Sequence, residues 1–254
     1  MWRSPMRLFW LSRTYIDRAT DKGAILKTLR ELRKRLDVEL LTGCRKEKVE
    51  GVRCLPSIKL PFLNHISLNL AMFLYLLKNL KPGDLVMTDY NSVFAALPFV
   101  KRARVMIDVR TLPVREGFLG ALEKLSFKIG LWVAKKAFWG ASFITEAMRR
   151  EVGQGFKRWA IWGSAVDLEL FDPAKYDRER ERARWGFEGT VFLYWGALEG
   201  SQRGLLEAAR AFRKAGLPPD AKLVFVGSGS LAPKLRELAE VRAPVPHEAV
   251  PSLL

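Results

Sequence analysis

Short apolar runs of strand length recur along the chain and are bounded by turn residues. They lie at 6–12, 37–43, 84–89, 103–110, 141–145, 190–195 and 221–226. Between them lie segments whose apolar residues recur every three or four positions, as in amphipathic helices. These segments are 23–36, 66–79, 91–98, 122–141, 205–216 and 231–240. The alternation predicts an α/β fold in which parallel sheets are covered by helices on both faces.

The character of the chain changes between residues 157 and 190. A segment rich in aromatic residues is followed by a charged helix at 177–187, in which opposite charges recur three or four residues apart. A second series of strands and helices then begins. We therefore predict two similar α/β domains, residues 1–165 and 166–254, in a chain of 254 residues.

The charge of the chain is strongly positive. The 43 Lys and Arg residues outnumber the 27 Asp and Glu residues, which gives a net charge of +16, and most of the excess lies before residue 170. The positive electrostatic potential of such a chain favours an anionic partner, namely a phospholipid surface, a phosphorylated substrate or a nucleic acid. The alternative is a solvated surface of a thermophilic protein, which the many Arg, Lys and Glu residues and the few amides also suggest.

The cysteines and the apolar segments indicate the compartment. Cys44 and Cys54 match neither a metal-ligand spacing nor a disulfide framework, so we expect a reducing cytoplasm. The run at 6–12 is too short for a signal peptide. Four polar residues interrupt the apolar stretch 60–77, which favours a buried or interfacial helix over a membrane span.

Two glycine loops end consecutive strands of the second predicted domain. Gly196 follows the run at 190–195, and Gly227 and Gly229 follow the run at 221–226. Glycine lets backbone N–H groups approach an anion, and the next helix adds the positive end of its dipole. Arg203 would add a fixed fork of donors. The alternative is that each loop is an ordinary turn.

A third candidate site ends the run at 103–110 in the first domain. Asp108 could orient a hydroxyl or accept its proton, and Arg110 could contact a phosphate. Arg115 and Glu116 follow in the same irregular loop. The alternative is an Asp–Arg ion pair that fixes the loop. His65 and His247 form no metal site, because a metal needs more ligands than these two supply.

Five segments, taken in order, resemble glycosyltransferase family 4, the retaining enzymes with the GT-B fold. They are IDVRTLP, SFITEAMRREV, WGSAVDLELFDP, the glycine loop segment VFLYWGALEGSQRGLLEAARAF with FVGSGSLAPKLREL, and VPHEAVPSLL. Within the third segment, Val166, Asp167, Phe171 and Pro173 match the family linker, while Ser164 and Ala165 stand where Asn-Gly is usual.

The resemblance implies two Rossmann-like domains and a reaction. Residues 1–165 would bind the acceptor, with Asp108 and Arg110 as catalytic residues. Residues 166–254 would bind a nucleotide diphosphate-sugar donor, whose diphosphate would contact Gly196, Arg203, Gly227 and Gly229. The resemblance further implies retained stereochemistry, no metal and no other cofactor.

Two departures from the family concern the donor site. Ala197 stands at the position of the family's Arg, so only Arg203 remains of a pair of cations. The sequence also stops before the family's motif of two glutamates separated by seven residues. The second domain is therefore expected to be incomplete, and a second polypeptide would have to complete the site if the chain is a split enzyme.

These observations combine into one hypothesis and one alternative. The hypothesis is a cytoplasmic glycosyltransferase, peripheral at the inner membrane face, that transfers a sugar to a polysaccharide, lipid-linked or glycolipid acceptor. The alternative is a non-catalytic or partner-dependent basic α/β subunit, or an inactive fragment without the donor-sugar site. Nucleic-acid binding is disfavoured, because the Trp residues lie mostly in apolar strands and helices rather than along a basic groove.

Overall fold

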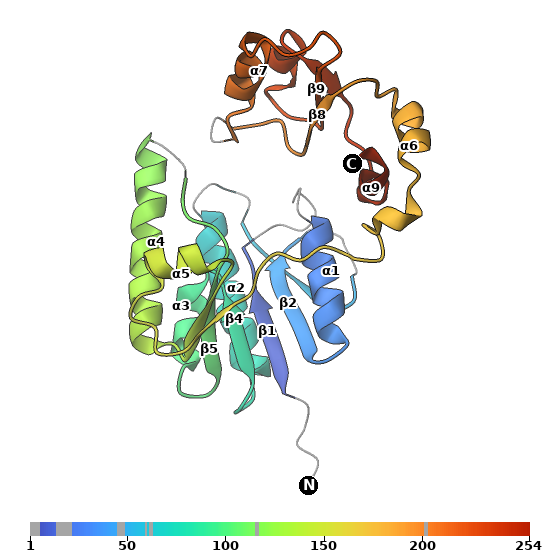
Figure 1. The fold of residues 1–254 in the computed structure, drawn as a ribbon. Helices are drawn as coiled ribbons and strands as arrows, with labels where there is room; N and C mark the ends of the chain where they lie inside the picture. Colours follow the sequence, from blue (N-terminus) through green and yellow to red (C-terminus); the bar gives the residue numbers. More distant parts are fainter. Residues whose placement is uncertain are drawn as a thin grey trace. The chain divides into compact units, whose positions relative to one another are not determined.

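The chain forms two compact units, residues 1–164 and 165–254, in a computed structural model (Figure 1). The structure describes residues 6–13, 22–44, 49–58, 60, 63–114, 117–200 and 203–254. Arg115 and Glu116, two of the loop residues singled out from the sequence, lie outside the described residues. Each unit is described by itself below.

The first unit is built on a parallel sheet whose described strands run in the order β3-β2-β1-β4-β5-β6-β7. Their bounds are β1 Arg7–Leu11, β2 Asp37–Gly43, β3 Val52–Leu55, β4 Leu85–Thr88, β5 Arg104–Val109, β6 Gly140–Phe143 and β7 Trp159–Ile161. The chain runs outward from β1 to β2 and β3, returns to β4 on the other side of β1, and continues outward from there. A doubly wound sheet has its topological switch point at such a reversal, here between β1 and β4.

Helices cover both faces of this sheet, and the strand residues alternate between the two faces (Figure 1). Leu8 and Trp10 pack with Leu29 of α1 on one face. On the other face, Phe9 and Leu11 pack with residues of α2 and α3. The helix bounds are α1 Lys22–Arg33, α2 Leu63–Asn79, α3 Val93–Ala96, α4 Gly117–Ala137 and α5 Glu146–Val152, with a 3₁₀ turn at Leu97–Phe99.

The second unit has a parallel sheet of the same kind, in the order β10-β9-β8 among its described residues. The strands are β8 Val191–Trp195, β9 Lys222–Val226 and β10 Glu240–Arg242. The helices are α6 Arg178–Trp185, α7 Leu205–Lys214, α8 Ala232–Arg236 and α9 Val250–Leu253, with 3₁₀ turns at Pro173–Lys175 and His247–Ala249. The predicted α/β class with parallel sheets in two Rossmann-like halves is confirmed.

Three short strands lack the apolar run that predicts the other strands from the sequence. β3, β7 and β10 have only three or four residues each, and they carry Arg53, Trp159 and Arg242 among exposed or half-buried positions. Each lies at an edge of its sheet, where one long side remains unpaired. Because an edge strand needs little apolar burial, its sequence lacks the pattern that reveals a central strand.

The expectation that the two cysteines form no disulfide is wrong. Cys44 and Cys54 are joined, with their Cα atoms 5.1 Å apart. β2 and β3 pair in parallel with Thr42 opposite Cys54, so Cys44 lies just beyond the end of its strand and beside its partner. The spacing of ten residues does not indicate this bond unless the pairing of β3 is known.

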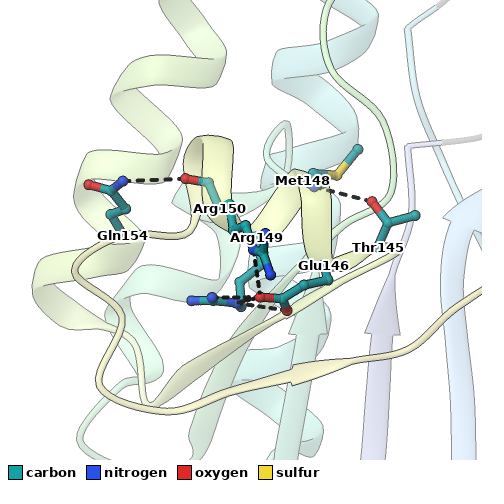
Figure 2. Close-up of polar contacts among 6 residues, drawn as sticks. All are labelled: Thr145, Glu146, Met148, Arg149, Arg150 and Gln154. Atoms are coloured by element: carbon teal, nitrogen blue, oxygen red, sulfur yellow. Dashed lines mark hydrogen bonds and ion pairs between the residues drawn. The ribbon is translucent and has the colours of Figure 1, made fainter.

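The segment SFITEAMRREV, which resembles a family 4 motif, contains the helix α5 (Figure 2). The Thr145 hydroxyl accepts the Met148 N–H at 3.1 Å and so caps the helix. The Glu146 carboxylate accepts from Arg149 at 2.6 and 2.9 Å and from Arg150 at 3.3 Å. The hydrogen bonds from Arg149 lower the pKa of Glu146. The charged residues of the motif therefore bond mainly to one another.

Candidate functional site

The carboxyl edge of the first unit's sheet gathers polar side chains at the switch point between β1 and β4. The backbone N–H of Arg13, two residues after β1, donates to Asp89 Oδ2 at 3.2 Å, and its guanidinium donates to Asn91 Oδ1 at 3.1 Å. Asp89 and Asn91 follow the end of β4. A crevice at a switch point is where open α/β sheets bind ligands. The topology therefore directs attention to residues that the sequence motifs do not include.

Asp89 is held mainly by the main chain. Its Oδ1 accepts the N–H groups of Asn91 and Ser92, each at 2.9 Å, and its Oδ2 accepts from Arg13. Burial raises the pKa of Asp89, and these hydrogen bonds with the charge of Arg13 counteract the rise. The arrangement fixes the turn after β4 and places a carboxylate at the carboxyl edge of the sheet.

Two residues of α2 extend this polar cluster. The Asn69 amide donates to the carbonyls of Asn91 and His65, at 3.1 and 2.9 Å. Its Oδ1 is buried and has no hydrogen-bond partner in the described part of the chain. Burial and the charge of Arg13 lower the pKa of His65, while Asp89 opposes that change. His65 is therefore a predominantly neutral imidazole near the cluster at neutral pH.

Asp108, the predicted catalytic carboxylate, lies near the end of β5 and is almost completely buried, with 6% of its surface exposed. Its Oδ1 accepts the Ser142 hydroxyl of β6 at 2.6 Å. Its Oδ2 lies 3.8 Å from Arg110 Nη1. The structure thus brings Asp108 and Arg110 together as a loose ion pair, with Ser142 as a partner that the sequence motifs missed.

Burial is the main influence on the ionisation of Asp108. It raises the pKa of the carboxyl, against the hydrogen bond from Ser142 and the charge of Arg110, and the negative charge of Asp89 adds to the rise. A carboxylate with a raised pKa is a stronger base than an exposed one. The two aspartates therefore form one electrostatically linked site at the ends of adjacent strands.

Arg110 is fixed by aromatic and main-chain contacts. Its Nη1 donates to the Trp162 carbonyl at 3.0 Å, and its guanidinium carbon lies 4.9 Å from the centre of a Trp162 ring. Trp162 in turn packs on Trp10 of β1, with ring centres 6.2 Å apart. A guanidinium stacked in this way keeps a constant position. Arg110 therefore supplies an oriented positive charge beside Asp108.

The glycine loops of the second unit pack against each other through their main chains. The Gly196 N–H donates to Val226 O, and the Leu198 N–H donates to Ser228 O, at 3.0 and 2.9 Å. A Cβ on Gly227 would fall on the Gly196 carbonyl oxygen, and a Cβ on Gly229 would fall on the Leu198 carbonyl oxygen. Both glycines are needed for this close approach.

This packing limits what the predicted donor glycines can do. The N–H groups of Gly196 and Gly227 already donate to Val226 O and to Arg242 O. An anion at this edge would therefore have to meet other groups, such as the amino end of α7. Gly204 caps that helix in the left-handed conformation, with φ of 62°.

Arg203 lies at the amino end of α7, as the predicted role requires. It is exposed, and its Nη1 contacts the Tyr194 hydroxyl at 3.4 Å. That hydroxyl also donates to the carbonyl of Ala197, at 3.1 Å. Tyr194 therefore links the cation to the loop that follows β8, a role that the sequence motifs did not suggest.

The linker-like motif forms a turn in the second unit. Asp167 Oδ1 accepts the N–H groups of Glu169 and Leu170, at 3.1 and 3.0 Å. Phe171 then stacks beside His247, with ring centres 5.7 Å apart, and Trp195 lies 6.0 Å from the same histidine. Phe171, His247 and Trp195 thus form an aromatic cluster. Because Gly196 directly follows Trp195, this cluster lies beside the first glycine loop.

The described residues contain no group of three or more His, Cys, Asp or Glu side chains that could hold a metal ion. His65 and His247 belong to different units. Among the described helices, none is both long and apolar enough to cross a membrane.

Comparisons with known proteins relate the fold to enzymes of sugar metabolism. No family model matches the chain, and no curated protein matches its sequence. The structure of the Anabaena protein Alr3699/HepE in complex with UDP is 13% identical, with a TM-score of 0.63, over 98% of this chain and 71% of that one.

Two further solved structures are similar. The α,α-trehalose 6-phosphate synthase of Burkholderia multivorans is 10% identical, with a TM-score of 0.68, over 98% of this chain and 74% of that one. The lipopolysaccharide outer core galactosyltransferase WaaB is 14% identical, with a TM-score of 0.57, over 94% and 68%. At these identities the likeness establishes a GT-B-like fold, and the chemistry has to be argued from the site.

Proposed function

We propose that the chain is a retaining glycosyltransferase of the family 4 type. The second unit would bind a nucleotide diphosphate-sugar, and the first would bind the acceptor. The proposal is carried by one observation: a buried carboxylate with a raised pKa, Asp108, is paired with an oriented cation, Arg110, at the carboxyl edge of a Rossmann-like sheet. The UDP bound to a protein of similar fold supports the choice of donor class.

In this proposal the residues have separate tasks. The bond between the anomeric carbon of the sugar and the diphosphate oxygen breaks, and a bond to the acceptor's hydroxyl oxygen forms. Asp108 accepts a hydrogen bond from that hydroxyl and takes up its proton, while Arg110 contacts an anionic group of the acceptor. Arg203 and the amino end of α7 meet the charge that develops on the leaving diphosphate. The proposed transfer requires no metal ion.

The donor part of the proposal is tested by calorimetric titration with UDP and other nucleoside diphosphates. We expect Arg203→Ala to weaken binding by about 10–100-fold, which corresponds to a charge-assisted hydrogen bond of about 1.5–3 kcal/mol. Arg210→Ala is the matched control, because Arg210 is exposed on the same helix further from its amino end. Equal binding by both variants, or no binding by the unmodified chain, would contradict the donor assignment.

The catalytic part is tested through hydrolysis of radiolabelled nucleotide-sugars, in which water takes the place of the acceptor hydroxyl, loses its proton to Asp108 and yields free sugar. We expect Asp108→Asn to lower the rate by about 10²–10⁴-fold, as for loss of a general base. Asp37→Asn is the control, because Asp37 is an exposed aspartate at the opposite end of a strand in the same sheet. Equal rates for the two variants would remove Asp108 from the mechanism.

A second candidate is a partner-dependent α/β subunit that needs another polypeptide for activity. The observation in its favour is that Ala197 supplies only a main-chain carbonyl, bonded to Tyr194, where the family has a cation. Exposed Phe192 and Trp195 on the edge strand β8 add to it. This candidate is favoured if the chain alone binds no nucleoside diphosphate but gains that binding in the presence of the native co-purifying protein.

The proposed setting is the cytoplasmic face of a membrane, with a polysaccharide, lipid-linked or glycolipid acceptor. The net charge of +16 supports attraction to an anionic surface.

A further inference from the structure

The outward face of α2 is apolar along its whole length. Residues 63, 66, 70, 74 and 77 are all Leu or Ile, and each is between 45% and 65% exposed. Leu68, Met72 and Leu76, on the opposite side of the helix, are buried in the core. A surface helix normally carries polar residues on the side away from the core. Here both sides are apolar.

The outward face of α4 repeats this arrangement. Its exposed residues are Phe118, Leu122, Leu125, Ile129 and Trp132, each between 41% and 78% exposed. Phe127, Leu131 and Ala134 face the core instead. Each outward row covers 14 residue steps, or about 21 Å at a rise of about 1.5 Å per residue.

The two rows belong to one side of the sheet. α3 contacts both α2 and α4, and Phe94 of α3 is 55% exposed. Figure 1 shows the three helices on the same side of the first unit, away from α1. We call the exposed apolar residues of α2, α3 and α4 the α2–α4 face. Apolar rows of this length on a surface indicate an interaction site rather than ordinary scatter.

The charges on these helices are predominantly positive. α2 and α4 together contain five lysines and one glutamate. The glutamate, Glu123, accepts a hydrogen bond from the Tyr90 hydroxyl at 2.9 Å. Lys78, Lys124, Lys128 and Lys136 are exposed. In contrast, the exposed residues of α7 include Glu207, Arg210, Arg213 and Lys214, a mixed and polar surface. The apolar rows are therefore a local property of the α2–α4 face.

We propose that the α2–α4 face docks onto an anionic phospholipid bilayer, with α2 and α4 lying in the plane of the interface. Long apolar rows bordered by lysines are suited to burial among headgroups and the adjoining acyl chains. A second copy of this chain is the less suitable occupant, because pairing two such faces brings lysines of like charge together. Trp132 ends the α4 row and is 62% exposed, and indole side chains are enriched at membrane interfaces.

The test is flotation of the full chain with two kinds of vesicle. One consists of phosphatidylcholine alone, and the other also contains about 30% of the anionic lipid phosphatidylglycerol. We expect binding to the anionic vesicles at low salt, reduced at high salt because the lysine contacts are screened. Ile66→Glu with Leu70→Glu is expected to reduce the partition coefficient by at least about tenfold. Lys124→Glu with Lys128→Glu is expected to reduce it by about fivefold or more for each lysine.

Matched controls come from outside the face. Leu168→Glu changes an apolar residue that is 78% exposed in the second unit, and Lys214→Glu reverses an exposed charge on α7. Both should leave vesicle binding within about twofold of the unmodified chain, as for substitutions away from the contact. Far-ultraviolet circular dichroism of every variant shows whether it has folded.

A second measurement keeps the proposal testable if a charged variant misfolds. Lipids brominated on the acyl chains quench tryptophan fluorescence on contact, and the conservative Trp132→Phe change should remove part of that quenching while the chain still binds. Absence of flotation, or equal loss of flotation in the control variants, would overturn the proposal. So would a stable dimer in sedimentation analysis that Ile66→Glu with Leu70→Glu dissociates. The glycosyltransferase proposal does not depend on any of these outcomes, because nucleotide titration tests it separately.

Discussion

The carboxyl edges of the two sheets are constructed in different ways. In the first unit the edge consists of charged side chains, with Asp89 and Asp108 beside Arg13 and Arg110. In the second unit it consists of main chain packed on main chain, where glycines allow two loops to share hydrogen bonds. Asp108 can therefore be altered in the first edge without displacing the backbone, because its carboxylate contacts the side chains of Ser142 and Arg110. In the second edge even one added methyl group must displace the backbone.

The largest effect is expected from Gly227→Ala, which tests the packing of the second edge. The new Cβ would fall on the Gly196 carbonyl oxygen, so we expect the free energy of unfolding of the second unit to fall by about 3–5 kcal/mol. Hydrogen exchange of the β8 and β9 amides reports that unit directly.

Gly216→Ala is the control for this prediction. Gly216 has φ of 60° and no atom within 4 Å of an added Cβ, so only conformational strain of about 1–2 kcal/mol is expected. If the two alanine variants lose equal stability, the close approach of the loops is not what requires Gly227.

The next effect is expected at the first edge, where Asp89→Ala removes the acceptor for three backbone N–H groups. We expect a loss of about 2–4 kcal/mol in the free energy of unfolding, because these donors lose their partner. Asp89→Asn should lose less, since its amide oxygen can still accept from Asn91 and Ser92. Urea unfolding distinguishes the two. Little or no loss in the alanine variant would show that the carboxylate does not hold the turn.

A pH-dependent effect is expected from Asp108. Its pKa is raised above the ordinary value of 3.8 by burial. The folded chain therefore binds more protons than the unfolded chain between these two values, and stability falls as the pH rises through that window. The contribution is fully present below the ordinary value and is lost above the raised one.

Asp108→Asn removes this titration. Its melting temperature should therefore decline less than that of the unmodified chain as the pH rises from the ordinary carboxyl pKa of about 4 to about 7. The Asn amide oxygen can still accept from Ser142, which makes the variant a close structural match. Parallel curves for the two proteins would contradict a raised pKa.

The smallest effect is expected from Tyr194→Phe in the second edge. The hydroxyl donates to Ala197 O and contacts Arg203, so its loss should cost about 0.5–1.5 kcal/mol. Tyr176→Phe gives the scale, because that hydroxyl makes one hydrogen bond of the same kind, to Leu170 O at 3.1 Å. A loss well below that of Tyr176→Phe would show that Tyr194 does not support the loop.

Much of the fold could be predicted because central strands and amphipathic helices have strong periodic patterns. β1, β4 and β5 follow apolar runs, and α7 follows a clear helical pattern. β3 and β10 could not be predicted in this way, because short edge strands bury few side chains. The disulfide between Cys44 and Cys54 was missed for the same reason, since it depends on the pairing of β3.

The candidate site could be predicted only in part. Asp108, Arg110 and Arg203 stand out as charged residues at strand or helix ends. Their roles remain predictions. Asp89 also follows a strand, but neither it nor Ser142 belongs to one of the motifs, and each becomes part of the site only when β4 and β6 lie beside β5.

The sequence by itself determined the local elements and the chemical groups at their ends, because periodicity and turn residues act over a few positions. Only the tertiary structure decided which of those groups meet. Strand order brought Arg13 to Asp89 across 76 residues and Ser142 to Asp108 across 34. It also left the apolar rows of α2 and α4 on the outside of the first unit, where a periodic sequence pattern alone would have assigned them to the core.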